Sequence, residues 1–457
     1  MAIELSNVTF TEQDDIVPAS GVEEILNTGI ANTLAGKDEI TGTGTEYNLI
    51  GEPTGDGMGF YNIGTGFYNI GTLNTADGND TITGIHSPTD PYNSIGLDVK
   101  SYGILHKAGI IDTGNGNDLI TGISEARIYD GSSNNNFGII IMSNSTLDTG
   151  KGNDIITGRG LDVGIGNSGT INTDDGDDQI TGTSGDRFGG SILNSGLINT
   201  GDGNDRITGT ATGTARSDVG LLNGNTIDTG NGNDIITGIG TRWGIENYSA
   251  INTGNGDDSI IAEADSDPFL AGYTSIMNKG SINTGNGNDS IIFYGKFTNH
   301  GGFFNGNVFL GEGNDSIIAD VSFSNRRAIE NFNAIETGDG DDLVTSSGVI
   351  YNDGTIKTGD GKDSIIADGG FDGSGNVLLG NGKDDLKGFG SGNFNGGNGK
   401  DTLELKSGIY TIGISGTTVN FTKNSIIMNT SEFEQLIAGG TTYNFSSFTN
   451  GQTIFVA

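Results

Sequence analysis

The chain of 457 residues has no cysteine, and it contains only 5 prolines, 3 histidines and 1 tryptophan. The lack of cysteine excludes a disulfide framework, a thiolate zinc site and a thiol nucleophile. Basic residues are also scarce, because 21 lysines and arginines face 58 aspartates and glutamates, which gives a formal net charge of −37. A surface this acidic repels phosphate, so we expect neither nucleic acid nor an anionic membrane as a partner.

Long apolar runs are missing as well. No stretch reaches the ~18 consecutive apolar residues of a membrane span, and residues 1–19 lack the basic and then apolar pattern of a cleaved signal peptide. Residues 30–405 contain no extended amphipathic helical pattern, whereas glycine supplies 82 residues and isoleucine and threonine are abundant. This composition weakens helices and favours strands and turns, so we expect a soluble all-β protein without membrane insertion.

A repeat runs through most of the sequence. Its clearest form is Ile-Asx-Thr-Gly-x-Gly-x-Asp-x-Ile, as in residues 111–120, 227–236 and 282–291. The spacing between aspartates of neighbouring copies varies from 17 residues at the C-terminal end to 42 at the N-terminal end. One aspartate per copy gives fourteen: Asp38, Asp80, Asp118, Asp154, Asp178, Asp205, Asp234, Asp258, Asp289, Asp315, Asp342, Asp363, Asp384 and Asp401.

The alternation of inward and outward residues predicts short strands on both sides of the glycine-rich turn. One coil cannot bury its own apolar face, so stacked coils are expected to form a parallel β-solenoid of about 14 or more coils. We expect an N-terminal cap in residues 1–26, the solenoid in residues 27–404 and a β cap in residues 405–457. Extra residues of long copies should form loops on one edge, and the three widest spacings fit either one coil or two.

A second pattern, apolar-x-Asn-x-Gly/Ala-x-Ile, precedes most copies and predicts another strand of the coil. Stacking would align its asparagines into a hydrogen-bonded ladder, although Asn-x-Gly also occurs in ordinary turns. The asparagines concerned are Asn69, Asn167, Asn194, Asn223, Asn247, Asn278, Asn331 and Asn352. Residues 59–72 repeat GFYNIGT in tandem, which is compatible with an extra half coil.

The turn Thr-Gly-x-Gly-x-Asp offers backbone carbonyls and one carboxylate, which are the hard oxygen ligands that calcium prefers. An Asx-type turn closed by aspartate is the simpler alternative, but it does not explain fourteen aspartates in register. Thirteen cations between fourteen turns would reduce the net charge from −37 to about −11, so we expect folding to depend on calcium. Besides the fourteen aspartates, the candidate metal-binding residues are Gly114, Gly116, Gly201, Gly203, Gly230, Gly232, Gly254, Gly256, Gly285, Gly287, Gly311, Gly313, Gly338, Gly340, Gly359, Gly361, Gly380, Gly382, Gly397 and Gly399.

Residues 396–404 (GGNGKDTLE) match the nonapeptide Gly-Gly-x-Gly-x-Asp-x-apolar-x, and the chain thereby resembles the repeats-in-toxin (RTX, hemolysin-type calcium-binding) family. The resemblance implies a right-handed parallel β-roll, calcium between turns, disorder without calcium and type I secretion through an uncleaved C-terminal signal. Residues 433–440 and the terminal residues 454–456 are similar to post-repeat and export segments of that family.

Two departures from the family pattern limit this transfer. Threonine replaces the first glycine in most copies, and a β-branched residue resists positive φ; the replacements are Thr113, Thr200, Thr229, Thr253 and Thr284. Only one nonapeptide occurs per coil, which implies calcium along one edge. The copies at Asp38 and Asp80 lack a further glycine, so their sites are expected to be weak or empty.

No catalytic motif is found, so we expect a protein that is not an enzyme. His86, His106 and His300 lie far apart in sequence and are expected in surface loops, as is the pair Arg326–Arg327. Ice binding through a threonine row in the turn is not expected, since the residue between the two glycines is never threonine.

Repeats that fill almost the whole chain resemble those of oscillin-type calcium-binding surface proteins of cyanobacteria. The leading hypothesis is a secreted, cell-surface structural protein that self-assembles into fibrils or a layer. The alternatives are a monomeric calcium-dependent adhesin that binds carbohydrate, for which Trp243 is a candidate contact, and a polysaccharide-modifying enzyme.

Overall fold

The computed structural model contains two compact units, residues 1–241 and residues 242–457. The structure describes residues 2–18, 23–46, 48–54, 57–88, 98–125, 135–185, 189–213, 218–264, 274–295, 303–304, 306–321 and 327–456. Almost all regular structure in these residues is β-strand, and the two helical segments are single 3₁₀ turns, η1 (Leu5–Asn7) and η2 (Phe445–Ser447). No helix in this part of the chain is long and apolar enough to cross a membrane.

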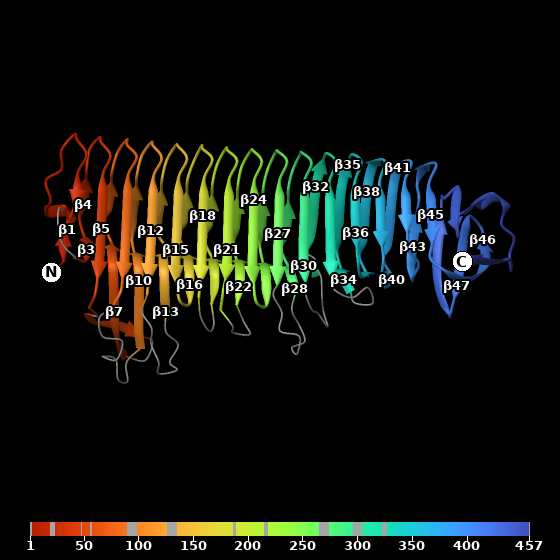
Figure 1. Cartoon of the computed structure of the whole chain (residues 1–457), viewed down its shortest axis with the longest axis horizontal. Coiled ribbons are helices and arrows are strands. Elements are labelled where there is room, and N and C mark those ends of the chain that lie inside the picture. The colour runs from red at the N-terminus through yellow and green to blue at the C-terminus, as the bar shows by residue number, and fades with distance from the viewer. Residues whose placement is uncertain are drawn as a thin grey trace. The chain divides into compact units, whose positions relative to one another are not determined.

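Each unit is a parallel β-solenoid whose coils share one path of three strands (Figure 1). In one coil the first strand is β16 (Val163–Asn167), the second is β17 (Thr170–Asn172) and the third, after the glycine-rich turn, is β18 (Gln179–Ser184). Each pairs in parallel with the same strand of the next coil, as β17 does with β20 (Leu197–Asn199). First, second and third strands therefore build a first, second and third sheet, which confirms the predicted all-β solenoid.

In the first unit, the same three series continue through all coils. The first sheet contains β1 (Ile3–Glu4), β3 (Ile25–Asn27), β7 (Gly57–Asn69), β10 (Asp98–His106), β13 (Asn135–Ile141), β16, β19 (Gly190–Asn194) and β22 (Val219–Asn223). The second contains β4 (Ile30–Asn32), β8 (Thr72–Asn74), β11 (Gly109–Asp112), β14 (Ser145–Asp148), β17, β20 and β23 (Thr226–Asp228). The third contains β2 (Ile16–Val17), β5 (Glu39–Gly44), β9 (Thr81–His86), β12 (Leu119–Ser124), β15 (Ile155–Gly160), β18, β21 (Arg206–Ala211) and β24 (Ile235–Gly240).

The second unit repeats this arrangement. Its first sheet contains β25 (Trp243–Asn247), β28 (Thr274–Asn278), β31 (Phe303–Phe304), β34 (Arg327–Asn331), β37 (Val349–Asn352) and β40 (Gly370–Asp372). Its second contains β26 (Ala250–Asn252), β29 (Ser281–Asn283), β32 (Asn307–Glu312), β35 (Ala334–Asp339), β38 (Thr355–Gly361), β41 (Asn376–Gly382), β43 (Gly392–Asn395) and β44 (Asn398–Gly399). Its third contains β27 (Ser259–Ala264), β30 (Ser290–Gly295), β33 (Ser316–Val321), β36 (Leu343–Ser346), β39 (Ser364–Ala367), β42 (Asp385–Lys387), β45 (Thr402–Leu405) and β49 (Gln435–Ala438).

Antiparallel strands follow the last coil of the second unit. β46 (Gly408–Ser415), β47 (Thr418–Lys423) and β48 (Ile426–Ser431) form a meander, and β48 returns to pair in parallel with β43. β51 (Thr453–Val456) pairs with β46, and β50 (Thr441–Asn444) pairs with β49. The rings of Phe421, Phe433, Phe445 and Phe448 pack edge-to-face or stacked beneath these strands, with centroid distances of 5.3 to 6.0 Å.

Isoleucine columns form the core of each unit. Ile156, Ile180 and Ile207 are in register on the third sheet, and each is completely buried. The second sheet contributes a facing column that includes Ile171 and Ile198, which are equally buried. Because every coil repeats this contact, each isoleucine is packed above and below by the corresponding residue of its neighbours.

The predicted asparagine ladder is confirmed. The Asn167 side-chain amide donates to Asn194 Oδ1 at 2.9 Å, Asn247 donates to Asn278 at 2.7 Å and Asn331 donates to Asn352 at 2.8 Å. These side chains are at most 4 % exposed. The ladder satisfies buried backbone and amide groups where the first strand turns into the second.

The expectation of histidines in surface loops is wrong for His86 and His106, which are both completely buried. His106 occupies a ladder position, with its Nδ1 3.1 Å from Asn69 Nδ2 and its Nε2 2.8 Å from the Thr146 carbonyl. His86 ends β9, and its Nδ1 lies 2.5 Å from Ser101 Oγ. Burial lowers the pKa of His86 to about 4, so this imidazole is neutral at physiological pH. His300 lies outside the described residues.

The widest spacings each contain one coil. The Asp38 amide donates to Asp80 Oδ1 at 2.7 Å, the Asp80 amide to Asp118 Oδ1 at 2.7 Å and the Asp118 amide to Asp154 Oδ1 at 2.8 Å, so these turns are direct neighbours. Most of the additional residues fall between a third strand and the next first strand, as between β9 and β10, which agrees with the expected insertion on one edge.

The tandem GFYNIGT segment is not an extra half coil. β6 (Asn48–Thr54) and β7 form an antiparallel hairpin over residues 48–63, and the second copy continues as an ordinary first strand. Phe67 of that copy is in register with Ile25 and is completely buried.

Replacing Ile180 by alanine should destabilise the calcium-loaded protein by about 2–5 kcal/mol, because a cavity is left in a column that cannot collapse. The matched control is Ile155→Ala, at a side chain that is 39 % exposed on the same sheet, and its effect should stay within about 0.5 kcal/mol. Urea unfolding followed by circular dichroism measures both changes. Equal effects of the two substitutions would contradict the assigned inward and outward faces.

Candidate metal centre

The glycine-rich turns require glycine for two physical reasons. Gly114 and Gly116 have φ values of +78° and +153°, which other residues rarely adopt. The turns also stack closely, so that a Cβ built at Gly150 would lie 1.8 Å from the Gly114 carbonyl oxygen, and one at Gly152 would lie 1.5 Å from the Gly116 oxygen. The Gly-x-Gly spacing therefore follows from left-handed backbone combined with direct carbonyl-to-backbone contact between coils.

Threonine in place of the family's first glycine does not disturb this geometry. The positive φ falls on the glycine after it, and Thr113 is completely buried. Its hydroxyl donates to the Thr149 carbonyl at 3.3 Å, as the Thr173 hydroxyl does to the Thr200 carbonyl at 3.2 Å. The β-branched residue thus forms a ladder of its own, which the sequence pattern did not reveal.

The turn aspartates are the central feature of both units. Within each unit, the backbone amide of one turn aspartate donates to Oδ1 of the aspartate in the following coil, as from Asp154 to Asp178 at 2.7 Å and from Asp289 to Asp315 at 2.8 Å. All fourteen predicted aspartates are at most 2 % exposed. Within each unit the structure therefore brings them into one buried column. The predicted glycines of the same turns lie beside it.

Two members of this ladder were missed at the sequence level. The Asp15 amide donates to Asp38 Oδ1 at 2.9 Å, and the Asp401 amide donates to Glu434 Oε2 at 2.7 Å. Asp15 precedes the short strand β2, and Glu434 precedes β49, so both occupy the turn position without a glycine-rich turn. The sequence marks these two positions only by an acidic residue directly before a short strand, as Asp15 precedes Ile16 and Val17.

The second carboxylate oxygen of most ladder aspartates is buried and receives no hydrogen bond. None of the ion pairs found within the described residues reaches the aspartates concerned. A buried carboxylate oxygen without a donor is costly unless a proton or a cation lies beside it. These oxygens belong to Asp80, Asp118, Asp154, Asp178, Asp205, Asp289, Asp315, Asp363, Asp384 and Asp401.

Burial is the main cause of altered acidity in this column. It raises the pKa of Asp178 to about 8, that of Asp118 to about 7 and that of Asp154 to about 6. In the second unit it raises the pKa of Asp315 and of Asp384 to about 7. Without a cation, the fold therefore favours protonated carboxyls at pH values where aspartate is normally ionised.

The residues present fit a hard divalent cation. No group of three or more acidic, histidine or cysteine side chains gathers within the described part of the chain. The carboxylates of two adjacent coils must therefore be supplemented by carbonyl oxygens of the turns, such as those of Gly114 and Gly116. An all-oxygen donor set with few charges suits calcium and suits zinc poorly.

An exposed ladder holds the turns from outside. The amide of Asn117 donates to Asn79 Oδ1 at 2.8 Å, and that of Asn153 donates to Asn117 Oδ1 at 2.9 Å. The Asp341 amide donates to Asn314 at 2.7 Å, and the chain of bonds reaches Lys362. The turn is thus positioned by hydrogen bonds on both of its faces.

The first two turns have another residue in place of the first glycine, and so does the turn before Asp178. Leu34 and Ala76 take the left-handed conformation, with φ of 71° and 61°, as Asp174 does with 55°. Non-glycine residues pay roughly 1–2 kcal/mol for this region. The Thr33 hydroxyl donates to the second oxygen of Asp38, which satisfies that oxygen without a cation. Weak or empty sites at Asp38 and Asp80 remain a prediction.

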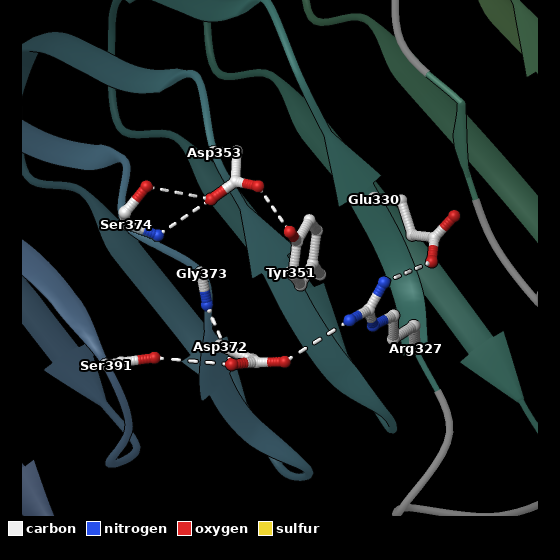
Figure 2. Close-up of polar contacts among 8 residues, drawn as sticks. All are labelled: Arg327, Glu330, Tyr351, Asp353, Asp372, Gly373, Ser374 and Ser391. Carbon is white, nitrogen blue, oxygen red and sulfur yellow. Dashed lines mark hydrogen bonds and ion pairs between the residues drawn. The ribbon is translucent and has the colours of Figure 1, made fainter. Parts of the chain in front are cut away.

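Arg327 does not lie in a solvated loop, because it begins β34 and is held by several groups (Figure 2). Its guanidinium pairs with the buried Glu330 at 3.1 Å and with Asp372 at 3.4 Å, and it lies 3.6 Å from the ring centroid of Tyr351. Asp372 also accepts from the Ser391 hydroxyl at 3.3 Å. The cluster links strands β34, β37 and β40, and its charged groups form ion pairs with one another. Arg326 lies outside the described residues.

Trp243, the candidate carbohydrate contact, begins β25 and is half-buried. The Arg242 guanidinium carbon lies 3.9 Å from the centre of its ring. One face of the indole is therefore covered by a cation–π contact.

No family model matches the chain, and no curated protein matches its sequence. Among solved structures, the chain is similar to a hyperactive, Ca²⁺-dependent, β-helical antifreeze protein from an Antarctic bacterium. The two share 18 % sequence identity with a TM-score of 0.34, over 96 % of each chain.

The metal-free protein should lose stability as the pH rises from about 4 to about 8. A carboxyl whose pKa is raised in the folded state holds its proton there longer than in the unfolded chain, so unfolding becomes more favourable as pH passes between the two values. For Asp178 this window ends near pH 8 and for Asp154 near pH 6. Thermal melts in chelator, followed by circular dichroism, measure the trend. A midpoint that rises over this range would contradict it.

Proposed function

We propose that this chain is a secreted calcium-binding structural protein of the cell surface, with calcium held between its stacked turns. The observation that carries this proposal is the buried aspartate ladder, in which Oδ1 is used by the neighbouring coil and Oδ2 of ten aspartates, Asp178 among them, has no donor. Calcium would neutralise these carboxylates and supply the partner that Oδ2 lacks. The net charge of −37 adds to the requirement for cations.

Secretion is proposed because a fold stabilised by many weak oxygen sites requires abundant calcium, as outside the cell. The similarity of residues 433–440 and 454–456 to RTX export segments favours type I secretion. No enzymatic activity is proposed, since His86 and His106 are buried within hydrogen-bond networks and the Arg327 cluster is internally paired.

Calcium titration of the metal-stripped protein should produce a cooperative rise in β-sheet circular dichroism, with magnesium giving little response. In Asp178→Asn the amide oxygen can still accept the Asp154 N–H, but the charge is lost. We expect calcium affinity at the adjacent sites to fall about tenfold or more, or roughly 1.4 kcal/mol, while the metal-free protein melts at the same or a higher temperature.

The control for this variant is Asp175→Asn in the same turn, where the side chain is 56 % exposed and pairs with Lys151. It should change neither the calcium response nor the metal-free melt. A full β-sheet spectrum in chelator at neutral pH, unchanged by calcium, would contradict the proposed metal sites.

Self-assembly is proposed from apolar side chains exposed on terminal strands. In the first unit, Ile16 of β2 is 59 % exposed and Ile30 of β4 is 70 % exposed. In the second unit, Ile409 of β46 and Phe455 of β51 are directly opposite each other and are 59 % and 69 % exposed. Two unlike surfaces on one chain allow a head-to-tail contact between copies, and such a contact produces filaments when the rotation from copy to copy does not close into a ring.

The edge strands favour the same mode of contact. Within the described residues, β4 pairs only with β8, and β51 pairs only with β46. The sequence of β51, Thr-Ile-Phe-Val, carries no charge that would discourage pairing with another chain.

The double variant Ile409→Asp/Phe455→Asp should abolish filaments formed in millimolar calcium, because it places two charges in the proposed contact. Ile110→Asp, at a second-sheet side chain that is 44 % exposed, is the control and should leave assembly intact. Light scattering and electron microscopy measure the outcome. Monomers of the unaltered protein at high calcium, or filaments of the double variant, would rule out this contact.

A further inference from the structure

A polar groove of about 440 Å³ lies on the outer face of the second sheet, near the C-terminal end of the second unit. Its walls come from the parallel strands β41, β43 and β48 and from β47, which folds back against β48. The lining residues are Asn376, Leu378, Asn393, Phe394, Asn395, Thr418, Asn429, Thr430 and Ser431.

Three asparagines follow one row along this groove. Asn376, Asn393 and Asn429 are in register on adjacent strands. Asn393 Nδ2 donates to Asn376 Oδ1 at 3.3 Å, and Asn429 Nδ2 donates to Asn393 Oδ1 at 3.1 Å. Asn393 Nδ2 also lies 3.4 Å from the Ser374 carbonyl oxygen. A carboxamide has two donors and an acceptor oxygen, so the end members of the row keep hydrogen-bonding capacity for a ligand.

A second row lies beside the first. Leu378, Asn395 and Ser431 are in register, and Asn395 Nδ2 donates to Ser431 Oγ at 3.2 Å. Leu378 is 37 % exposed and supplies an apolar surface, while Thr418 adds a hydroxyl from β47. The groove therefore offers amides, hydroxyls and the exposed apolar side chain of Leu378 at fixed strand spacing.

Charge is absent from this lining, although the chain contains 58 acidic and 21 basic residues. Charged residues stop where the groove begins. In the row that contains Leu378, the two preceding coils carry Glu336 and Lys357. Without a charge, the lining offers no strong attraction to a metal ion, a phosphate or a carboxylate. Its chemistry suits a neutral ligand with many hydroxyl groups.

The spacing of the asparagine row also limits the ligand. Adjacent strands lie about 4.8 Å apart, which is comparable to the length of one pyranose ring. Successive sugar rings of a chain laid across β41, β43 and β48 would each meet one asparagine, and a ring's C–H face would contact Leu378.

We propose that this groove binds a neutral carbohydrate chain over two or three sugar rings. The lining residues take no part in the aspartate ladder or in the proposed filament contact. Carbohydrate binding can therefore be tested separately from calcium binding and from filament formation. It gives a position for carbohydrate binding other than Trp243.

Isothermal titration of the full calcium-loaded chain tests this inference with neutral cellohexaose, maltohexaose and mannohexaose, and with an acidic alginate hexamer as the contrast. We expect at least one neutral hexasaccharide to bind and the alginate hexamer to bind at least tenfold more weakly. In Asn393→Ala/Asn429→Ala the affinity for the neutral chain should fall at least tenfold.

The control is Asn283→Ala, at an exposed asparagine of β29 on the second sheet of the same unit, which should bind as the unaltered chain does. The melting temperature of each variant verifies that the fold is retained. If the double variant unfolds, Leu378→Lys replaces it and should reduce binding to the same extent. The inference is overturned if none of the neutral hexasaccharides binds, if alginate binds as well as they do, or if the folded variant binds unchanged.

Discussion

Everything in this protein depends on a carboxylate that is buried where one coil meets the next. Each aspartate gives one oxygen to the backbone amide of the preceding coil, and that bond fixes the register between coils. The geometry requires glycine at two positions of the turn, because carbonyl oxygens of one coil point at the backbone of the next. The same burial raises the pKa of the carboxyls, so the bond that sets the register also creates the need for a cation.

Much of this arrangement could be predicted from the sequence, because a solenoid repeats the same local contact many times. The aspartates, the ladder asparagines and the inward isoleucines recur at fixed positions in most copies, so the period of the repeat predicts which residues are neighbours. Residues that occupy a ladder position without the repeat motif around them could not be predicted. His106 stands where other coils have asparagine, and Asp15 and Glu434 hold ladder positions without a glycine-rich turn.

Other features depend on contacts between coils that the period does not encode. The place of Arg327 follows from Tyr351 and Asp372, which lie on the next two coils, and neither residue is part of the repeat. The hairpin of β6 and β7 looks like a duplicated coil because its second strand repeats the sequence of a true first strand. The threonine of the turn was judged against the family's glycine, whereas the structure places the positive φ one residue later.

Because of where the insertions lie, the length of a copy does not affect the register between neighbouring coils. Copies of 17 and of 42 residues present their aspartates to one another through the same amide-to-carboxylate bond. Most extra residues lie between a third strand and the next first strand, and one or two more lie between the first and second strands at β10–β11 and β13–β14. Segments of very different size can therefore be exchanged at this edge without altering the coils, which makes the molecule a natural display scaffold. A grafted peptide between β18 and β19 would be presented at a fixed interval from its neighbours, and its sequence could diverge freely while the metal-binding edge stays under constraint.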